Sequence, residues 1–227
     1  MLNFWHLNVT ILNIVLFIII FYPIIGGIGW SVGVLCYKYI FKHQQLDWIK
    51  LPSEIEPMIS IMIPAHNEEV TIKKTVDYLI NKLNYSNFEV IVIDDGSNDQ
   101  TLKILKNLQN QYSNLKVIRI EDNKGKAHAL NIGLAFAKGE LILSNDADSI
   151  PETDALKKYV NYFIRSDAAN IAAVTGNIDI HNRDKLVAKS QLVEFSSIVG
   201  TIKRTELGVF GAFTHTVVQV PCIGKMH

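Results

Sequence analysis

The expected fold rests on two stretches, MISIMIPAHNEE (residues 58–69) and FEVIVIDDGSND (residues 88–99). Each stretch begins with a short run of apolar, mostly β-branched residues and ends in a group of polar residues. Such a run indicates a buried β-strand, because a helix buried to the same extent would need more residues. The polar group indicates a turn where the strand ends. We therefore expect two strands whose carboxyl ends carry most of the chemistry.

The same alternation of strand and helix patterns continues along the chain. Strands are expected at residues 58–63, 88–93, 115–120, 141–143 and 171–175. Helices are expected at residues 67–81, 97–111, 126–138 and 151–165. This order predicts an α/β fold, a Rossmann-like and mostly parallel sheet with helices on both faces.

Helix ends are predicted from residues that favour capping. Asn67 is expected to cap the first helix, with Glu68 and Glu69 in its first turn. Gly139 is expected to end the third helix, and Pro151 to open the fourth.

The N-terminal segment is almost entirely apolar from Val9 to Ile40, and its first charged residue is Lys38. About 20 apolar residues span the hydrocarbon core of a bilayer. A signal peptide would instead begin with a positively charged region, which the first ten residues lack. We therefore predict a transmembrane anchor over residues 1–43. The lysines that follow the apolar run place the N-terminus outside and the rest of the chain in the cytoplasm.

Beyond the anchor, residues 44–57 are polar, contain two prolines and are expected to be a linker. One domain is expected over residues 58–206, and residues 207–227 form an atypical tail. Residues 184–205 could form an amphipathic helix on the membrane or a core helix.

Composition excludes several classes of function. The chain has 22 Lys and Arg residues and 22 Asp and Glu residues, so its net charge is zero. Nucleic-acid binders usually carry a basic excess, and no nucleic-acid partner is expected. Neither G-x-G-x-x-G nor the P-loop pattern occurs, which argues against a dinucleotide dehydrogenase or a P-loop enzyme.

Acidic residues follow the second and fourth predicted strands, at Asp94–Asp95 and at Asp146-Ala147-Asp148. Either group alone is more often a turn or a helix cap. Together they place several carboxylates at one edge of one sheet, where ligands of such folds bind. Like charges in a cleft raise each other's pKa unless a cation is present. A hard divalent cation, Mg²⁺ or Mn²⁺, is the economical explanation.

The segment NKGKA (residues 123–127) follows the third predicted strand and opens a helix. Loop lysines are usually solvated surface charges. Lys126, however, lies at a helix N-terminus on the ligand edge, where a diphosphate is favoured.

The ordered motifs PAHNEE (64–69), IDDGSNDQT (93–101), NKGKAHALNIGL (123–134) and LSNDADS (143–149) resemble family 2 glycosyltransferases, which have the GT-A fold. AVTGNIDI (173–180) and QLVEFSSIVGTIKRT (191–205) are most similar to processive, membrane-bound polysaccharide synthases. Among these, the resemblance is greatest to the poly-β-1,6-N-acetylglucosamine synthases of biofilms.

The resemblance implies a role for individual residues. Asp95 would hold the uracil of a UDP-sugar, Lys126 would face the diphosphate, Asp146 would contact the ribose or donor sugar, and Asp148 would bind the metal. The other expected contacts are Pro64, Ala65, Asn67 and Glu68 around the nucleotide, and Gly176 and Asn177 on the acceptor side. The implied reaction is inverting, metal-dependent transfer of a sugar, expected to be N-acetylglucosamine, to a growing β-linked glycan. The resemblance also implies a bacterial-type inner membrane location and a small membrane subunit as a partner.

The sequence departs from the family after Asn177. The family's general base comes from a Glu-Asp pair, and a Q-x-x-R-W motif and further transmembrane helices follow it, but none of these occurs here. We therefore expect a truncated, inactive fragment that binds a UDP-sugar weakly. Polymer synthesis by this chain alone would contradict that expectation. Transfer to a lipid phosphate carrier, a hyaluronan-, chitin- or cellulose-type synthase, and a non-catalytic nucleotide-binding remnant remain alternatives.

Overall fold

The structure is a computed structural model that describes residues 2–41, 56–164, 173–174, 176, 186–197 and 222–224. The chain divides into two units. One unit contains the N-terminal helix α1 (Leu2–Phe41) and helix α6 (Leu186–Ser197), and the other contains the sheet. The predicted linker lies outside the described residues except for residues 56 and 57.

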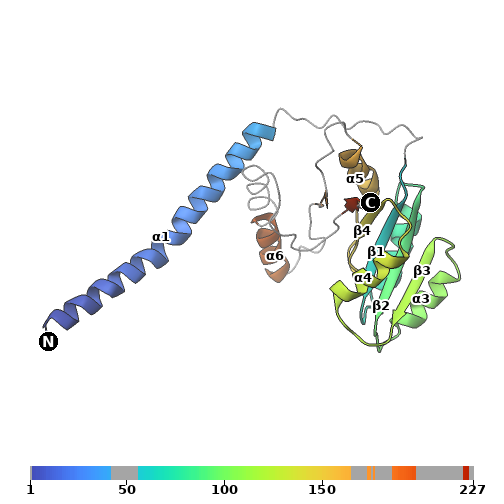
Figure 1. Ribbon diagram of the computed structural model, residues 1–227, viewed down its shortest axis with the longest axis horizontal. Coiled ribbons are helices and arrows are strands. Elements are labelled where there is room, and N and C mark those ends of the chain that lie inside the picture. The colour runs from blue at the N-terminus through green and yellow to red at the C-terminus, as the bar shows by residue number, and fades with distance from the viewer. Residues whose placement is uncertain are drawn as a thin grey trace. The chain divides into compact units, whose positions relative to one another are not determined.

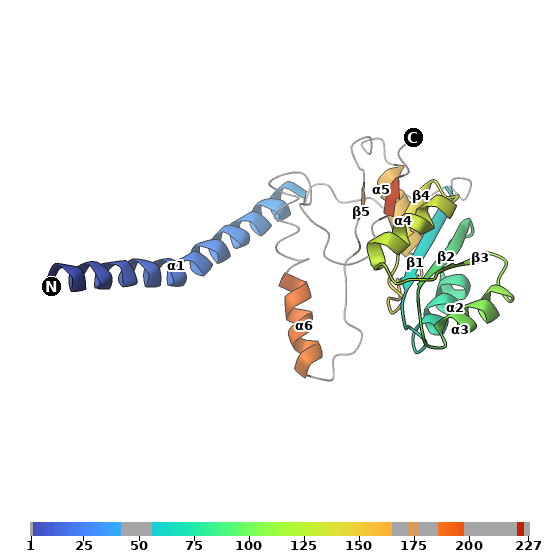
Figure 2. The same ribbon diagram turned by 60° about the horizontal axis from the view of Figure 1, so that its bottom comes forward.

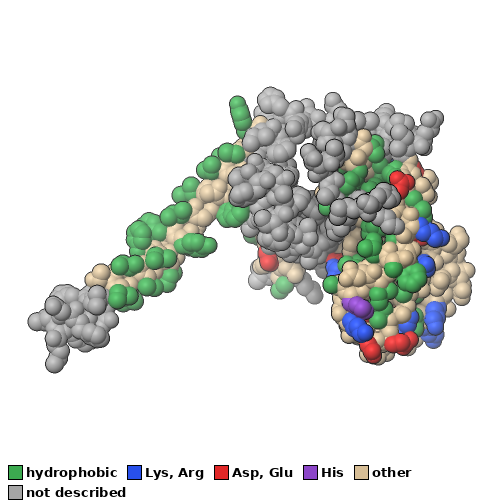
Figure 3. All heavy atoms as spheres, in the orientation of Figure 1, with side chains coloured by type: hydrophobic (Ala, Val, Ile, Leu, Met, Phe, Trp, Pro, Cys, Tyr) green, Lys and Arg blue, Asp and Glu red, His purple; other side chains and the backbone are tan. Residues whose placement is uncertain are grey.

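Helix α1 is continuous over 40 residues and contains Pro23 (Figure 1). Its segment Thr10–Cys36 is long and apolar enough to cross a membrane, and nearly all of its residues are exposed. Hydrophobic side chains cover the described part of α1 (Figure 3). The predicted N-terminal apolar helix is confirmed as a candidate membrane span.

Helix α6 covers the centre of the predicted helix at 184–205, and the rest of that range lies outside the described residues. Val187 and Val193 are 69% and 68% exposed, so neither side chain lies in a core within the described part of the chain.

The sheet has the strand order β3-β2-β1-β4-β6-β5. Strands β1 (Ile59–Ala65), β2 (Phe88–Asp95), β3 (Leu115–Ile120) and β4 (Leu141–Ser144) are parallel, as predicted. Strand β5 (Ala173–Val174) falls within the predicted fifth strand. The short strand β6 (Cys222–Gly224) pairs antiparallel with both β4 and β5, although the sequence assigned this segment to an atypical tail.

Four helices connect or follow the parallel strands, and the sequence predicted all of them. They are α2 (Ile72–Lys82), α3 (Thr101–Gln109), α4 (Lys126–Phe136) and α5 (Ala155–Phe163). Helices α2, α3 and α5 pack against one face of the sheet and α4 against the other (Figure 2).

The predicted start of the first helix at Asn67 is wrong. Asn67 has a left-handed backbone with φ of 56°, and α2 begins five residues later. The backbone N–H groups of Asn67 and Glu68 donate to side-chain oxygens of Ser97 and Thr101, at 2.9 Å each. These residues form a turn because their donors link them to the loop after β2 and to the first residue of α3.

Gly139 does not end α4, and Pro151 does not open α5. Helix α4 ends at Phe136, because the N–H groups of Lys138 and Gly139 donate to the side chains of Glu89 and Ser60 at 2.8 Å. Helix α5 begins at Ala155, because the carbonyl of Thr153 accepts the N–H of Asn84 at 2.7 Å.

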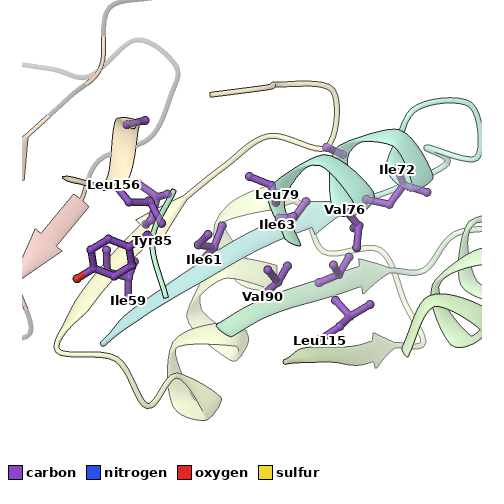
Figure 4. Packing of buried hydrophobic residues seen from close by; sticks show 14 of the residues in the cluster. Ile59, Ile61, Ile63, Ile72, Val76, Leu79, Tyr85, Val90, Leu115 and Leu156 are labelled. Carbon is purple, nitrogen blue, oxygen red and sulfur yellow. The ribbon is translucent and has the colours of Figure 1, made fainter. Parts of the chain in front are cut away.

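The core has two layers, one on each face of the sheet. Ile59, Ile61 and Ile63 of β1 point to one face and pack with α2, α3 and α5 (Figure 4). Met62 points to the other face, where Ile91, Ile93 and Ala129 surround it. Strands β1, β2 and β4 are buried on both faces, which explains why each is a continuous apolar run.

Gly139→Ala is expected to reduce the free energy of unfolding by about 2 kcal/mol through overpacking. A Cβ there would lie 2.5 Å from the backbone nitrogen of Ser60 and 2.8 Å from the backbone oxygen of Met58. Urea unfolding followed by circular dichroism measures the loss.

Gly133→Ala is the matched control, because its Cβ would first meet the flexible Cδ1 atom of Ile93 at 2.8 Å. A smaller loss is expected there, since alanine also favours the helix. Equal losses for the two variants would contradict the explanation.

Candidate functional site

A cleft of about 370 Å³ opens at the carboxyl ends of β1, β2 and β4. This is the edge at which ligands bind in open α/β sheets, and the order of the strands reverses there between β1 and β4. Four chain segments line the cleft, and the last residue of one of them, Lys126, begins α4. The lining residues are Pro64, Ala65, His66, Glu68, Asp95, Asn123, Gly125, Lys126, Asp146, Ala147 and Asp148.

Asp95 lies at the end of β2 and is only 2% exposed. Its carboxylate accepts the backbone N–H of Lys124 at 3.1 Å and that of Gly125 at 2.8 Å. Gly125 has φ of 89°, a conformation that favours glycine. The carboxylate therefore fixes the loop that leads into α4.

Gly96, the next residue, has φ of 68°. A Cβ there would lie 2.8 Å from the backbone nitrogen of Asn123, so the two loops approach closely. Glycine is required at this position both by its backbone conformation and by the space available.

His66 and Asn67 brace the ends of β1 and β2. Nδ1 of His66 lies 2.6 Å from the Asp95 carbonyl, and its Nε2 lies 3.0 Å from Nδ2 of Asn67. Oδ1 of Asn67 accepts the N–H of Asn98 at 2.9 Å. With Nδ1 as the donor, His66 is a hydrogen-bonding part of the cleft wall.

Asp94 and Arg119 form an ion pair behind the cleft. Asp94 is fully buried, and its Oδ1 atom accepts the N–H of Ser97 at 3.3 Å. Arg119 also donates to the carbonyl of Ser97 at 3.2 Å. The pair therefore fixes the turn after β2 to strand β3.

Asp99 joins this turn to the one after β1, because it accepts the N–H of Glu69 at 3.2 Å and that of Thr101 at 2.9 Å. Partial burial tends to raise the pKa of its carboxyl. The hydrogen bonds from Thr101 and Glu69 outweigh that effect, so its pKa is below the ordinary value.

The acidic loop, Asp146 to Ser149, follows β4. Asp146 forms an ion pair of 2.5 Å with Nζ of Lys126, at the start of α4. Asp148 is exposed and accepts a hydrogen bond from Ser149 Oγ at 3.3 Å. One carboxylate is thus paired across the cleft, and the other faces solvent.

The residues present fit a divalent cation that a bound phosphate helps to hold. Within the described ranges, no three His, Cys, Asp or Glu side chains gather closely enough to hold a metal by themselves. Mg²⁺ commonly uses only one or two carboxylates together with phosphate oxygens. Asp148, with Asp146 beside it, supplies that hard oxygen donor set.

Most of the residues predicted for the site lie together. Pro64, Ala65, Glu68, Asp95, Lys126, Asp146 and Asp148 all line the cleft. Asn67 does not line it, because its side chain binds His66 and Asn98. Gly176 is half-buried, its missing Cβ position lying 2.5 Å from the hydroxyl oxygen of Tyr159. Asn177 lies outside the described residues.

Sequence reasoning missed the buried side chains beneath the acidic loop. Thr75 of α2 and Asn145 after β4 both donate to carbonyls of that loop. No sequence motif indicates the contact of Thr75, which lies 72 residues from its partner.

A mostly parallel sheet with acidic and lysine-bearing loops at its carboxyl edge is the architecture of a GT-A glycosyltransferase domain, which is the fold of this unit. Residues 60–217, more than half of the chain, match the sequence model described as "Glycosyl transferase family 2". The chain belongs to that family, and the sequence-based resemblance is confirmed.

Similar proteins include poly-beta-1,6-N-acetyl-D-glucosamine synthases. The chain is 33% identical over 190 residues to the one from Staphylococcus epidermidis strain RP62A, and 31% identical over 192 residues to the one from Staphylococcus aureus strain COL. Each match covers 83% of this chain and 45% of the relative, so the chain spans about half the length of these synthases.

Among solved structures, the chain is similar to the mannosyltransferase PcManGT from Pyrobaculum calidifontis in complex with GDP-Man and Mn²⁺. The TM-score is 0.50 and the sequence identity is 24%, over 65% of this chain and 45% of that one. This likeness supports the fold.

Proposed function

We propose that the cleft binds the nucleotide diphosphate of a UDP-sugar together with Mg²⁺ or Mn²⁺, and that the whole protein transfers the sugar to a growing β-linked glycan with inversion. The observation that carries the proposal is the joining of Asp95, Lys126, Asp146 and Asp148 in one cleft at the carboxyl edge. Sequence similarity to poly-beta-1,6-N-acetyl-D-glucosamine synthases supports N-acetylglucosamine as the transferred sugar.

Asp95 is suited to bind the uracil. An ionised carboxylate has about four acceptor sites and no donor. Two backbone N–H groups use part of that capacity, which leaves acceptor capacity for the N3–H group of uracil. A hydrogen bond to a charged acceptor of this kind is among the stronger ones in proteins.

Lys126 and Asp146 would exchange partners when the donor binds. The diphosphate is the stronger anion for Lys126, and the N-terminus of α4 favours the same charge. Asp146 then becomes available to the ribose or donor sugar, and Asp148 to the metal. A bound divalent cation would neutralise the charge that develops on UDP as it leaves.

Calorimetric titration of the full chain in detergent with UDP, with and without Mn²⁺, tests the proposal. Asp148→Ala is expected to remove the Mn²⁺-dependent gain in UDP affinity, a loss of about tenfold for one metal carboxylate, and to leave metal-free binding unchanged. The physical reason is that Asp148 contacts the nucleotide only through the metal.

Glu140→Ala is the matched control, because this exposed carboxylate precedes β4, whereas Asp148 follows it. It is expected to behave like the wild type. A wild-type chain that binds no UDP, or whose affinity is the same with and without Mn²⁺, would refute the donor site as proposed.

We also propose that α1 spans a bacterial-type inner membrane with its N-terminus outside, which leaves the cleft in the cytoplasm. Lys38 in its last turn supports this orientation. A small membrane subunit as a partner stays a prediction from the resemblance.

A further inference from the structure

The acidic loop is held from beneath by buried side chains that do not line the cleft. Nδ2 of Asn145 donates to the carbonyls of Asp146 at 2.8 Å and Ser149 at 2.9 Å. Oγ1 of Thr75 donates to the carbonyl of Ala147 at 2.7 Å. Three of the four carbonyls in the loop are therefore fixed by two side chains.

Thr75 lies in the first turn of α2 and is 2% exposed. A threonine hydroxyl within a helix often bonds a carbonyl of its own helix, one turn earlier. Here it bonds a different segment, 72 residues further along the chain. This bond fixes the middle of the acidic loop, between Asp146 and Asp148, to a helix of the core.

Asn145 is completely buried, and its backbone N–H continues the sheet by donating to the carbonyl of Met62 at 2.9 Å. Both side-chain N–H groups are used by the loop, whereas its Oδ1 atom has no partner among the described residues. A buried acceptor without a partner costs free energy. The side chain of Asn145 therefore takes this orientation because its two N–H donors bind the acidic loop, although Oδ1 is left without a partner among the described residues.

We propose that Thr75 and Asn145 are positioning residues that hold Asp146 and Asp148 in the arrangement that receives the metal and the diphosphate. The inference rests on the proposed function of the cleft. Its physical basis is that Mg²⁺ and Mn²⁺ bind weakly to carboxylates on a mobile loop, because the loop must be ordered when the metal binds. Residues that order the loop in advance remove that cost.

The hydroxyl of Thr75 can be tested with a closely matched pair of variants. Thr75→Val preserves the shape of the side chain and removes the donor, whereas Thr75→Ser preserves the donor. In calorimetric titrations of the full chain with UDP, Thr75→Val is expected to reduce the Mn²⁺-dependent gain in affinity about tenfold. Metal-free UDP affinity should change less than twofold, and Thr75→Ser should restore the gain.

The inference is overturned if Thr75→Val keeps the full Mn²⁺-dependent gain, or if Thr75→Ser is as impaired as Thr75→Val, which would show that packing matters and the hydroxyl does not. If Thr75→Val does not unfold cooperatively, Asn145→Leu provides the same test, since it removes both donors from a side chain of the same branching and adds no buried charge. A wild-type chain that gains nothing from Mn²⁺ would instead refute the proposed function, and the inference with it.

Discussion

Arg119→Met is expected to reduce the free energy of unfolding of the sheet unit by about 3 kcal/mol, the lower end of the cost of breaking a buried ion pair. Asp94 is fully buried, and Arg119 is the cation that pairs with it among the described residues. Methionine would fill a similar volume but leave the carboxylate unpaired in the interior. The side chain of Arg119 is 27% exposed, so water can partly compensate.

Urea unfolding of the full chain in detergent, followed by circular dichroism, measures this loss. Lys158→Met is the matched control, because Lys158 pairs with the exposed carboxylates of Glu152 and Asp154. Surface pairs of this kind contribute about 1 kcal/mol or less.

The double variant Asp94→Leu with Arg119→Met should be more stable than Arg119→Met alone, since it removes the unpaired charge. An Arg119→Met loss no larger than that of Lys158→Met would show that Asp94 does not depend on its partner.

Strands β1, β2 and β4 were predictable because each is buried on both faces and is therefore an apolar run bounded by polar residues. Strand β3 is buried only at Leu115 and Ile120, and its short run of β-branched residues indicated it instead. The starts of α2 and α5 were not predictable from the sequence. Asn67 and Pro151 favour helix starts, but neighbouring backbone groups bond to other loops instead, as Asn67 does with Ser97. Local preference is a weak guide where such tertiary bonds exist.

Strand β6 was missed because it has only three residues, Cys222–Gly224, and owes its conformation to pairing with β4 and β5. Such a segment has no periodicity of its own for the sequence to reveal.

The cleft was predictable because parallel strands bring their carboxyl ends to one edge, so polar residues after β1, β2 and β4 had to meet. The supports of the cleft were not predictable in the same way. Thr75 is a buried polar residue on the inner face of an ordinary amphipathic helix, and only the tertiary structure shows which carbonyl it meets. Motifs therefore indicate the residues that touch a ligand, whereas the residues that hold them are set by packing.

Asp95→Asn is expected to weaken UDP binding about 100-fold, equivalent to about 2.7 kcal/mol, whether or not Mn²⁺ is present. An asparagine of the same size has one carbonyl oxygen where Asp95 has two carboxylate oxygens, each of which accepts a backbone N–H. Its NH₂ group would face a backbone donor or the uracil N3–H group, and neither can accept a hydrogen bond. The loss thus combines a weakened uracil contact with a loosened loop before α4.

Asp122→Asn is the control, since it removes the same charge from an exposed residue near the cleft that does not line it.

CDP provides a second comparison, because N3 of cytosine is an acceptor and should be repelled by the carboxylate of Asp95. The wild type should therefore bind UDP more tightly than CDP, and Asp95→Asn should reduce that preference, since an amide can present either a donor or an acceptor. If Asp95→Asn kept the full preference for UDP over CDP, the uracil would not contact residue 95, even if the affinity for UDP fell. A loss of binding confined to titrations with Mn²⁺ would assign Asp95 to the metal, so the two readouts together distinguish its contact with the base from the role proposed for Asp148.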